Sequence, residues 1–111
     1  MDVRYERQLK RGVLEIIVLK MISEAPTYGY QLLSDMDQRS GGVFKIKEGT
    51  LYPILYRLED DGMIRSEWSI PKDKDVSKKY YVITEQGRGT LDELVTLWSE
   101  FSAVVRKMLE G

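Results

Sequence analysis

The sequence contains no cysteine and no histidine. Without cysteine the chain can form no disulfide, no thiolate metal site and no cysteine nucleophile, and a reducing compartment is permitted. Without histidine it also lacks the commonest general base and the commonest zinc ligand. These absences argue against an enzyme, and the sequence predicts no catalytic residue, no metal site and no cofactor.

Long apolar runs are missing as well. No segment is long enough to span a bilayer, and residues 1–7 lack the apolar stretch of a signal peptide. We therefore expect a cytoplasmic protein with no membrane partner. The net charge is −1, from 17 Lys and Arg against 18 Asp and Glu, so any binding of nucleic acid must depend on where the basic residues lie.

The 111 residues, of which 42% are hydrophobic, suit one compact domain. Thr27 and Thr84 each precede a segment of helical periodicity and are predicted N-caps. Pro53 should lie in the first turn of its helix, where a missing N–H costs little, and Gly62 should end that helix. Apolar residues at helical spacing predict four helices, over residues 7–23, 28–38, 48–61 and 85–109, and the first is apolar almost all round in its second half. The predicted inner stripes are Gly29, Leu32, Leu33 and Met36 on the second helix and Leu51, Ile54, Leu55 and Leu58 on the third.

Three segments have the character of strands. Residues 64–69 and 79–83 alternate and are rich in Trp, Tyr, Val and Ile, which predicts a hairpin with a charged tip. Residues 43–46 are predicted to form a minimal edge strand. The resulting order predicts a mainly α protein with a small β-hairpin: a winged helix-turn-helix domain over residues 1–84, followed by a C-terminal dimerisation helix over residues 85–111.

The third predicted helix is the candidate DNA reader. In this motif the N-terminal part of the second helix of the pair enters the major groove. Arg57, on the same helix, can bind guanine or a phosphate. The alternative is a solvated face on which Arg57 pairs with Asp61. The candidate DNA-binding residues of this helix and the segment before it are Lys45, Lys47, Thr50, Pro53, Tyr56 and Arg57.

The tip and flank of the hairpin carry several lysines, as a wing that lies along the DNA backbone would. Asp73 and Asp75 are interleaved with them, so a solvated turn is the competing interpretation. The candidate wing residues are Lys72, Lys74, Lys78 and Lys79.

The last predicted helix has apolar residues in two heptad series, which is typical of a coiled-coil seam. The alternative is that this stripe closes the domain's own core. Dimerisation is favoured, and a symmetric dimer would read a pseudo-palindromic operator. Trp98 is either packing or the wall of a ligand cavity. The candidate interface residues for the dimer or a ligand are Leu9, Val13 and Ile16 on the first predicted helix and Leu91, Leu94, Trp98, Phe101, Val105 and Met108 on the last.

Several of these segments together resemble the PadR family of transcriptional regulators. The similar segments are Tyr28-Gly29-Tyr30-Gln31-Leu32, residues 48–55, Arg57-Leu58-Glu59, residues 61–64, Lys79-Tyr80-Tyr81 and residues 84–87. The resemblance implies a homodimeric winged helix-turn-helix protein, usually a repressor, joined through its N-terminal and C-terminal helices. The single C-terminal helix is similar to that of the short subfamily.

The resemblance also implies roles for individual residues. It adds Tyr52 to the recognition helix and places residues 72–79 on the wing. Trp98 matches a tryptophan of short members that stacks on planar aromatic ligands at the dimer interface, which implies a hydrophobic small-molecule effector. The alternative is a winged helix that binds another protein or a small molecule without operator DNA, for which the acidic pI of about 5.5 is the main argument.

Overall fold

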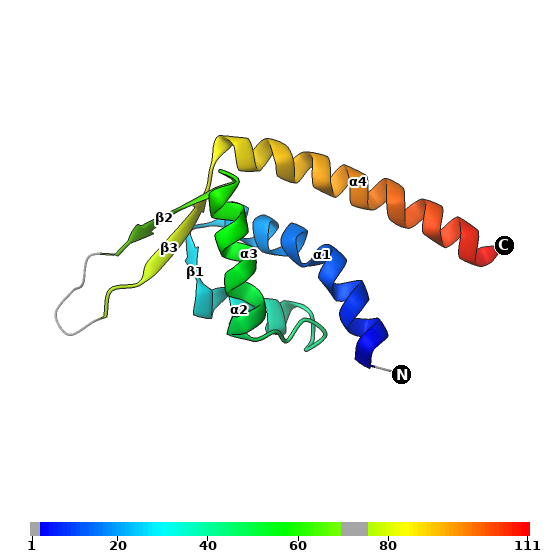
Figure 1. Cartoon of the computed structure of the whole chain (residues 1–111), viewed down its shortest axis with the longest axis horizontal. Coiled ribbons are helices and arrows are strands. Elements are labelled where there is room, and N and C mark those ends of the chain that lie inside the picture. Colours follow the sequence, from blue (N-terminus) through cyan, green and yellow to red (C-terminus); the bar gives the residue numbers. More distant parts are fainter. Residues whose placement is uncertain (1–2, 70–75) are drawn as a thin grey trace.

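The computed structural model describes residues 3–69 and 76–111 (Figure 1). Helices α2 and α3 form the helix-turn-helix and strands β2 and β3 the wing, which confirms the predicted fold. Neither described stretch contains a helix long and apolar enough to cross a membrane. In chain order the elements are α1 (Val3–Glu24), β1 (Thr27–Tyr28), α2 (Gly29–Arg39), α3 (Glu48–Asp60), β2 (Ile64–Trp68), β3 (Lys79–Ile83) and α4 (Glu85–Glu110).

The strands form one antiparallel sheet in the order β1-β3-β2. Ile64 lies opposite Ile83 and Trp68 opposite Lys79, which confirms the predicted hairpin. On the other edge of β3, Thr27 lies opposite Tyr81. The sheet therefore joins the end of α1 to the wing.

The predictions of a strand over residues 43–46 and of an N-cap at Thr27 were wrong. Residues 43–46 do not form the third strand, because Gly41 and Gly42 adopt φ of 61° and 87° and lead the chain into a turn that carries Phe44 against the core. The third strand is instead β1, so Thr27 belongs to the sheet and is not an N-cap. Tyr28 is the N-cap of α2, and its side chain makes no capping bond.

The core lies where α1, α2, α3 and the sheet meet. Tyr81, at its centre, is 1% exposed, and burial raises the pKa of its hydroxyl to about 12. The predicted inner faces of α2 and α3 and the broadly apolar second half of α1 are confirmed. The buried side chains are Leu14, Val18, Leu19, Met21 and Ile22 of α1, Leu32 and Met36 of α2, Leu51, Ile54, Leu55 and Leu58 of α3, and Ile64, Tyr81 and Ile83 of the sheet.

Helix α3 begins without a capping side chain. Its N-cap is Lys47, whose carbonyl accepts hydrogen bonds from the backbone N–H groups of Thr50 and Leu51 at 3.0 and 3.1 Å. Because the helix begins at Glu48, Pro53 lies in its second turn and not in the first as predicted. Proline lacks the N–H that would bond to the carbonyl four residues earlier, and the exposure of Pro53 lets water reach that carbonyl.

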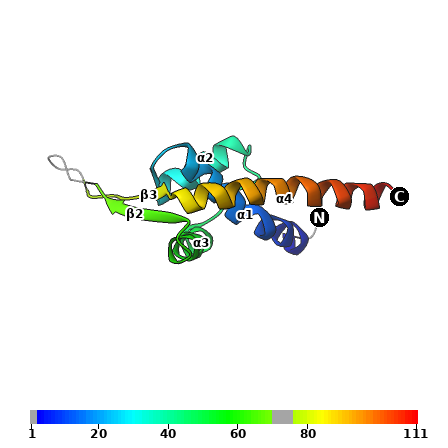
Figure 2. The same ribbon diagram turned by 90° about the horizontal axis from the view of Figure 1, so that it is seen from above.

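Helix α4 begins at a side-chain cap and then leaves the domain. The Thr84 hydroxyl accepts a hydrogen bond from the backbone N–H of Gly87 at 3.0 Å, which confirms the predicted N-cap. Leu91 is buried and Leu94 packs against the core, whereas the rest of the helix extends beyond it (Figure 2). The molecule is consequently elongated, with extents of 61 × 32 × 21 Å.

Candidate nucleic-acid interface

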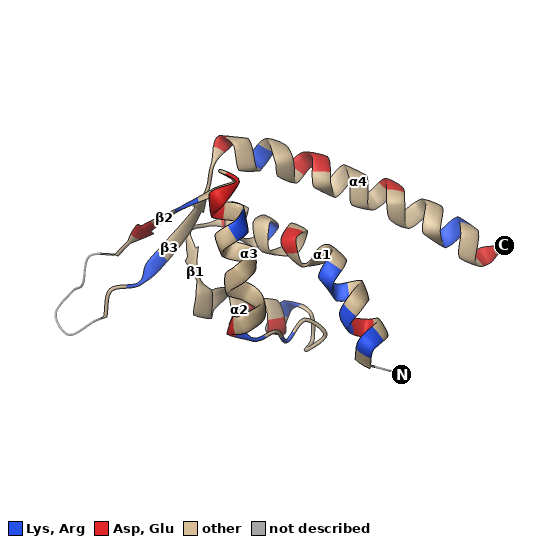
Figure 3. Ribbon diagram, viewed as in Figure 1, with Lys and Arg blue, Asp and Glu red and all other residues tan. Residues whose placement is uncertain are grey.

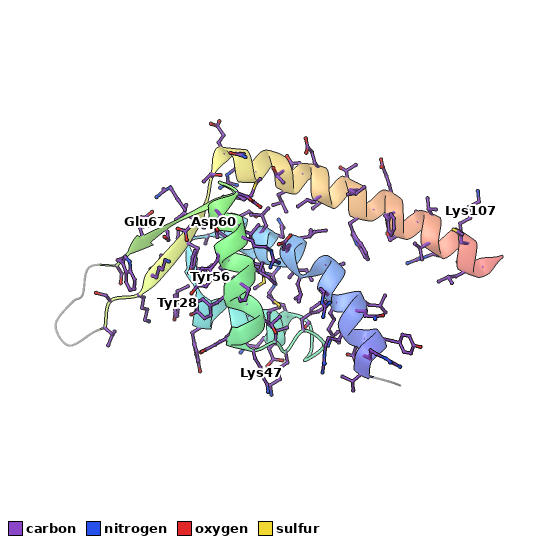
Figure 4. The ribbon with its side chains drawn as sticks, viewed as in Figure 1. Tyr28, Lys47, Tyr56, Asp60, Glu67 and Lys107 are labelled. Atoms are coloured by element: carbon purple, nitrogen blue, oxygen red, sulfur yellow. The ribbon has the colours of Figure 1, made fainter. Side chains whose placement is uncertain are left out.

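The outer face of α3 is free of contacts with the core. Thr50, Pro53 and Tyr56 are exposed, and Tyr56 keeps 54% of its surface accessible, while the leucines and Ile54 of the opposite face are buried. Figure 4 shows Tyr56 projecting from this helix, with Lys47 at its start and Asp60 near its end. The exposed face therefore offers hydroxyl, aromatic and apolar groups of the kinds that contact phosphates and base edges.

Arg57 lies in the last turn of α3 and is tied to α1. Its Nη2 is 2.8 Å and its Nε 2.9 Å from Oε1 of Glu15, and both side chains remain about half exposed. Among the described residues Arg57 pairs with Glu15, and the alternative pair with Asp61 is not present. Sequence reasoning missed this pair because Glu15 and Arg57 lie 42 residues apart.

Tyr52 points inward and not toward the outer face. Its side chain is half-buried, and its hydroxyl fills the space where a Cβ on Gly29 would be, so it packs α3 against the start of α2. Its ring lies 6.2 Å from that of Tyr56. Tyr52 thus holds the two helices of the motif together beneath the exposed Tyr56.

The base of the wing brings lysines next to aromatic rings. Lys78 is exposed, with its Nζ 4.4 Å from the centre of the Tyr28 ring. Lys79 is half-buried, and its Nζ lies 3.8 Å from Oε1 of Glu59 on α3. Lys72 and Lys74 lie outside the described residues. Trp68 of β2 is 67% exposed beside Lys78 and Lys79, a position that sequence reasoning did not single out.

The predicted seam of α4 divides into two parts. Leu91 and Leu94 serve the domain's own core, so this part follows the alternative interpretation. Beyond them the seam residues keep 40% to 77% of their surface exposed within the single chain. Trp98 lines a groove of about 570 Å³ between α4 and α1, together with Leu9, Val13 and Ile16. The exposed seam residues are Trp98, Phe101, Val105 and Met108.

The sequence model of the Transcriptional regulator PadR-like family matches residues 18–93, from the middle of α1 into α4. The chain belongs to this family. The members of this family are transcriptional regulators and not enzymes. The match includes β1, the helix-turn-helix, the wing strands and the start of α4, but not the exposed part of the α4 seam.

Two similar proteins align with most of the chain. An uncharacterized protein X of Lysinibacillus sphaericus is 37% identical over 91% of this chain and 92% of its own length. The crystal structure of a PadR family transcriptional regulator from Eggerthella lenta is 35% identical, with a TM-score of 0.82 over 93% of this chain and 87% of that one.

One PadR structure contains DNA. Bacillus subtilis PadR in complex with operator DNA is 26% identical, with a TM-score of 0.66 over 75% of this chain and 46% of that one. A curated sequence of that organism, the negative transcriptional regulator PadR, is 28% identical over 73% of this chain and 44% of its own length. The present chain thus corresponds to less than half of the longer protein.

Proposed function

We propose that this PadR-like chain binds a pseudo-palindromic operator as a homodimer and represses transcription. The observation that carries the proposal is the outer face of α3, where Thr50, Pro53 and Tyr56 are exposed although the helix fills the core with its other side. This face has no role in the fold and suits the major groove. The operator complex of Bacillus subtilis PadR supports the same use of the fold.

The dimer is supported by the apolar surface that the single chain leaves uncovered. Phe101 is 64% and Met108 77% exposed on α4, and Leu9 is 75% exposed on the facing side of α1. Exposed apolar surface of this extent on a soluble chain marks an interface. We assign residues 85–111 as the dimerisation helix, which a second copy would cover together with α1.

Repression is inferred from a relative of the chain, and its location in the cell from its DNA partner. The Bacillus subtilis relative is named a negative regulator, which favours repression over activation here. A protein that acts on operator DNA must reach the chromosome, and we therefore expect it in the cytoplasm.

The groove beside Trp98 favours a small-molecule effector. Its volume of about 570 Å³ lies within the usual range of ligand pockets, and its lining is mainly apolar, with Trp98 and Phe44 offering planar surfaces. A planar hydrophobic effector would release DNA by binding the released dimer geometry better than the DNA-bound one. A coupling of about 1–3 kcal/mol is enough for such control.

The effector hypothesis has a direct test in calorimetry with proflavine as the planar aromatic probe. We expect the wild-type chain to bind the dye, and Trp98→Phe to bind it at least several-fold more weakly. Trp68→Phe, which removes the other tryptophan at the distant wing, is the control and should bind as the wild type does. Equal binding by all three chains would contradict a role for Trp98 beyond packing.

The operator hypothesis is tested by selection of bound sequences from a pool of random DNA duplexes. We expect enrichment of a pseudo-palindrome whose half-sites are about one helical turn apart, since a twofold dimer places its two α3 helices at that spacing. An enriched site without dyad symmetry would contradict the dimeric arrangement. No enrichment at all would favour a winged helix that serves a protein partner.

A further inference from the structure

A basic groove lies on the side of α3 away from the wing. It has a volume of about 500 Å³ and is formed by the N-terminal half of α1, the segment before α3 and the first turn of α3. Five of its lining residues are cationic and one is acidic, although the whole chain has a net charge of −1. The charged residues that line the basic groove are Arg7, Lys10, Arg11, Lys45, Lys47 and Glu6.

The arginines of the basic groove are not neutralised within the chain. Lys10 pairs with Glu6 at 3.0 Å, so these two charges compensate one another. Arg7 and Arg11 are exposed, and across residues 3–69 and 76–111 neither has an ion-pair or side-chain hydrogen-bond partner. Two guanidinium groups one helical turn apart are therefore available to an anionic partner.

The basic and apolar sides of α1 adjoin one another, since Glu6 and Lys10 line both the basic groove and the groove beside Trp98. Leu9 and Val13 line the groove beside Trp98, whereas Arg7 and Arg11 line the basic groove next to Thr50. One turn after Arg11, Glu15 holds Arg57 of α3 at 2.8 Å. This ion pair ties the basic side of α1 to the helix that carries the candidate reading face.

The arrangement of the elements indicates the partner. Figures 1 and 2 both place α3 between the wing strands on one side and the N-terminal half of α1 on the other, and Figure 3 shows the basic residues of α1 along that half. A duplex that receives α3 in its major groove has a phosphate backbone on each side of the helix. The wing can reach one backbone and α1 the other.

We infer that Arg7 and Arg11 bind phosphates of the operator on the side of α3 opposite the wing. The inference rests on the proposed function, and it adds α1 as an element that anchors the duplex. Arginine suits this role, because its planar guanidinium binds phosphate oxygens in a bidentate manner and stays charged. Such contacts fix the position of α3 and add affinity for any sequence.

The test is the salt dependence of duplex binding by the full chain, measured by fluorescence anisotropy with the selected duplex. For Arg7→Gln/Arg11→Gln we expect the slope of log K against log salt to become shallower by about 3.6, because a dimer loses four phosphate contacts at about 0.9 each. The ratio of wild-type to variant affinity should then fall by a factor of about 150 between 50 and 200 mM salt. A scrambled duplex should show a similar loss.

Two control variants separate a phosphate contact from other causes. Arg7→Lys/Arg11→Lys keeps the charges and should keep most of the slope. Lys20→Gln/Arg88→Gln removes the same charge from exposed residues that do not line the basic groove and should leave the slope nearly unchanged.

The inference is overturned if the double glutamine variant keeps the wild-type slope, or if Lys20→Gln/Arg88→Gln lowers it equally. It is also overturned if sedimentation shows that Arg7→Gln/Arg11→Gln has lost the dimer, because the arginines would then serve the partner chain. Failure of the proposed function looks different: the wild-type chain itself would then bind no duplex in a salt-dependent manner.

Discussion

Single residues show how the position of a side chain in the fold decides its role. Thr27 has the sequence context of an N-cap, but pairing with Tyr81 places it in β1, and there its Oγ1 is buried without a hydrogen-bond partner among the described residues. Thr84 has a similar context and does cap its helix. The two threonines differ because Thr27 is itself a residue of β1, whereas β3 ends at Ile83, one residue before Thr84. Local sequence does not reveal where a strand that forms by long-range pairing begins and ends.

Thr27→Val should therefore stabilise the protein. Valine has the same shape without the unsatisfied hydroxyl, and we expect the free energy of unfolding to rise by about 1 kcal/mol. Urea denaturation of the variant and the wild type measures the difference. A loss of about 1 kcal/mol, as expected for removal of an N-cap, would contradict the structure at this position.

Gly87 is needed for the close approach of α4 to the end of the helix-turn-helix. A Cβ at this residue would collide with the carbonyl oxygen of Met63, whereas at Gly89, two residues further along α4, it would meet no atom within 4 Å. Gly87→Ala should lower the free energy of unfolding by about 1–3 kcal/mol through overpacking. Gly89→Ala, the matched control, should raise it by up to about 1 kcal/mol. Equal effects of the two substitutions would contradict the described packing.

Tyr56 is the exposed aromatic residue of the candidate reading face. Tyr56→Ala should weaken binding of the selected duplex by about 1–3 kcal/mol while the dimer stays intact. Tyr56→Phe keeps the ring and shows how much of the effect belongs to the hydroxyl. Anisotropy titrations measure both variants, and unchanged affinity of Tyr56→Ala would remove Tyr56 from the interface.

Among the elements, those with strong helical periodicity could be predicted from sequence. Both α3 and α4 begin at the predicted residue, and the buried leucines of α3 are those of the predicted stripe. The position of Arg57 on α3 predicts an outward side chain, and the family resemblance adds Tyr52 to the recognition helix, but these side chains turn to Glu15 and Gly29 respectively. The direction of a long side chain depends on its neighbours in space, which periodicity along one helix does not specify.

A charge placed in the apolar seam of α4 should prevent dimerisation. Phe101→Glu places a charge among exposed apolar residues and should convert the dimer to monomer, because burying an unpaired carboxylate at an interface is costly. Ala103→Glu adds the same charge off the seam and should leave the dimer intact. Sedimentation velocity compares the two variants. A dimer that survives Phe101→Glu would contradict the assignment of α4.

At the scale of the whole molecule, the wing, the outer face of α3 and the basic groove are the three surfaces that the proposed DNA binding uses. Helix α3 lies between the wing strands and the N-terminal half of α1, and α4 extends away from them (Figures 1 and 3). The basic groove is formed on the α1 side of α3, and α4 carries exposed apolar residues. The net charge of −1 does not reveal this arrangement, because it sums the cations of the basic groove with exposed carboxylates elsewhere, such as Asp92, Glu93 and Glu100 of α4. Local charge, and not the total, is what a duplex meets.

In the proposed complex, two copies of the chain hold one duplex through their α3 helices. The most direct test of this arrangement is an anisotropy titration of the selected duplex, against a scrambled duplex of equal length, at several salt concentrations. We predict two chains per duplex, tighter binding of the selected sequence, and affinity that falls steeply with salt. One chain per duplex, or equal and weak binding of both duplexes at every salt concentration, would contradict the account.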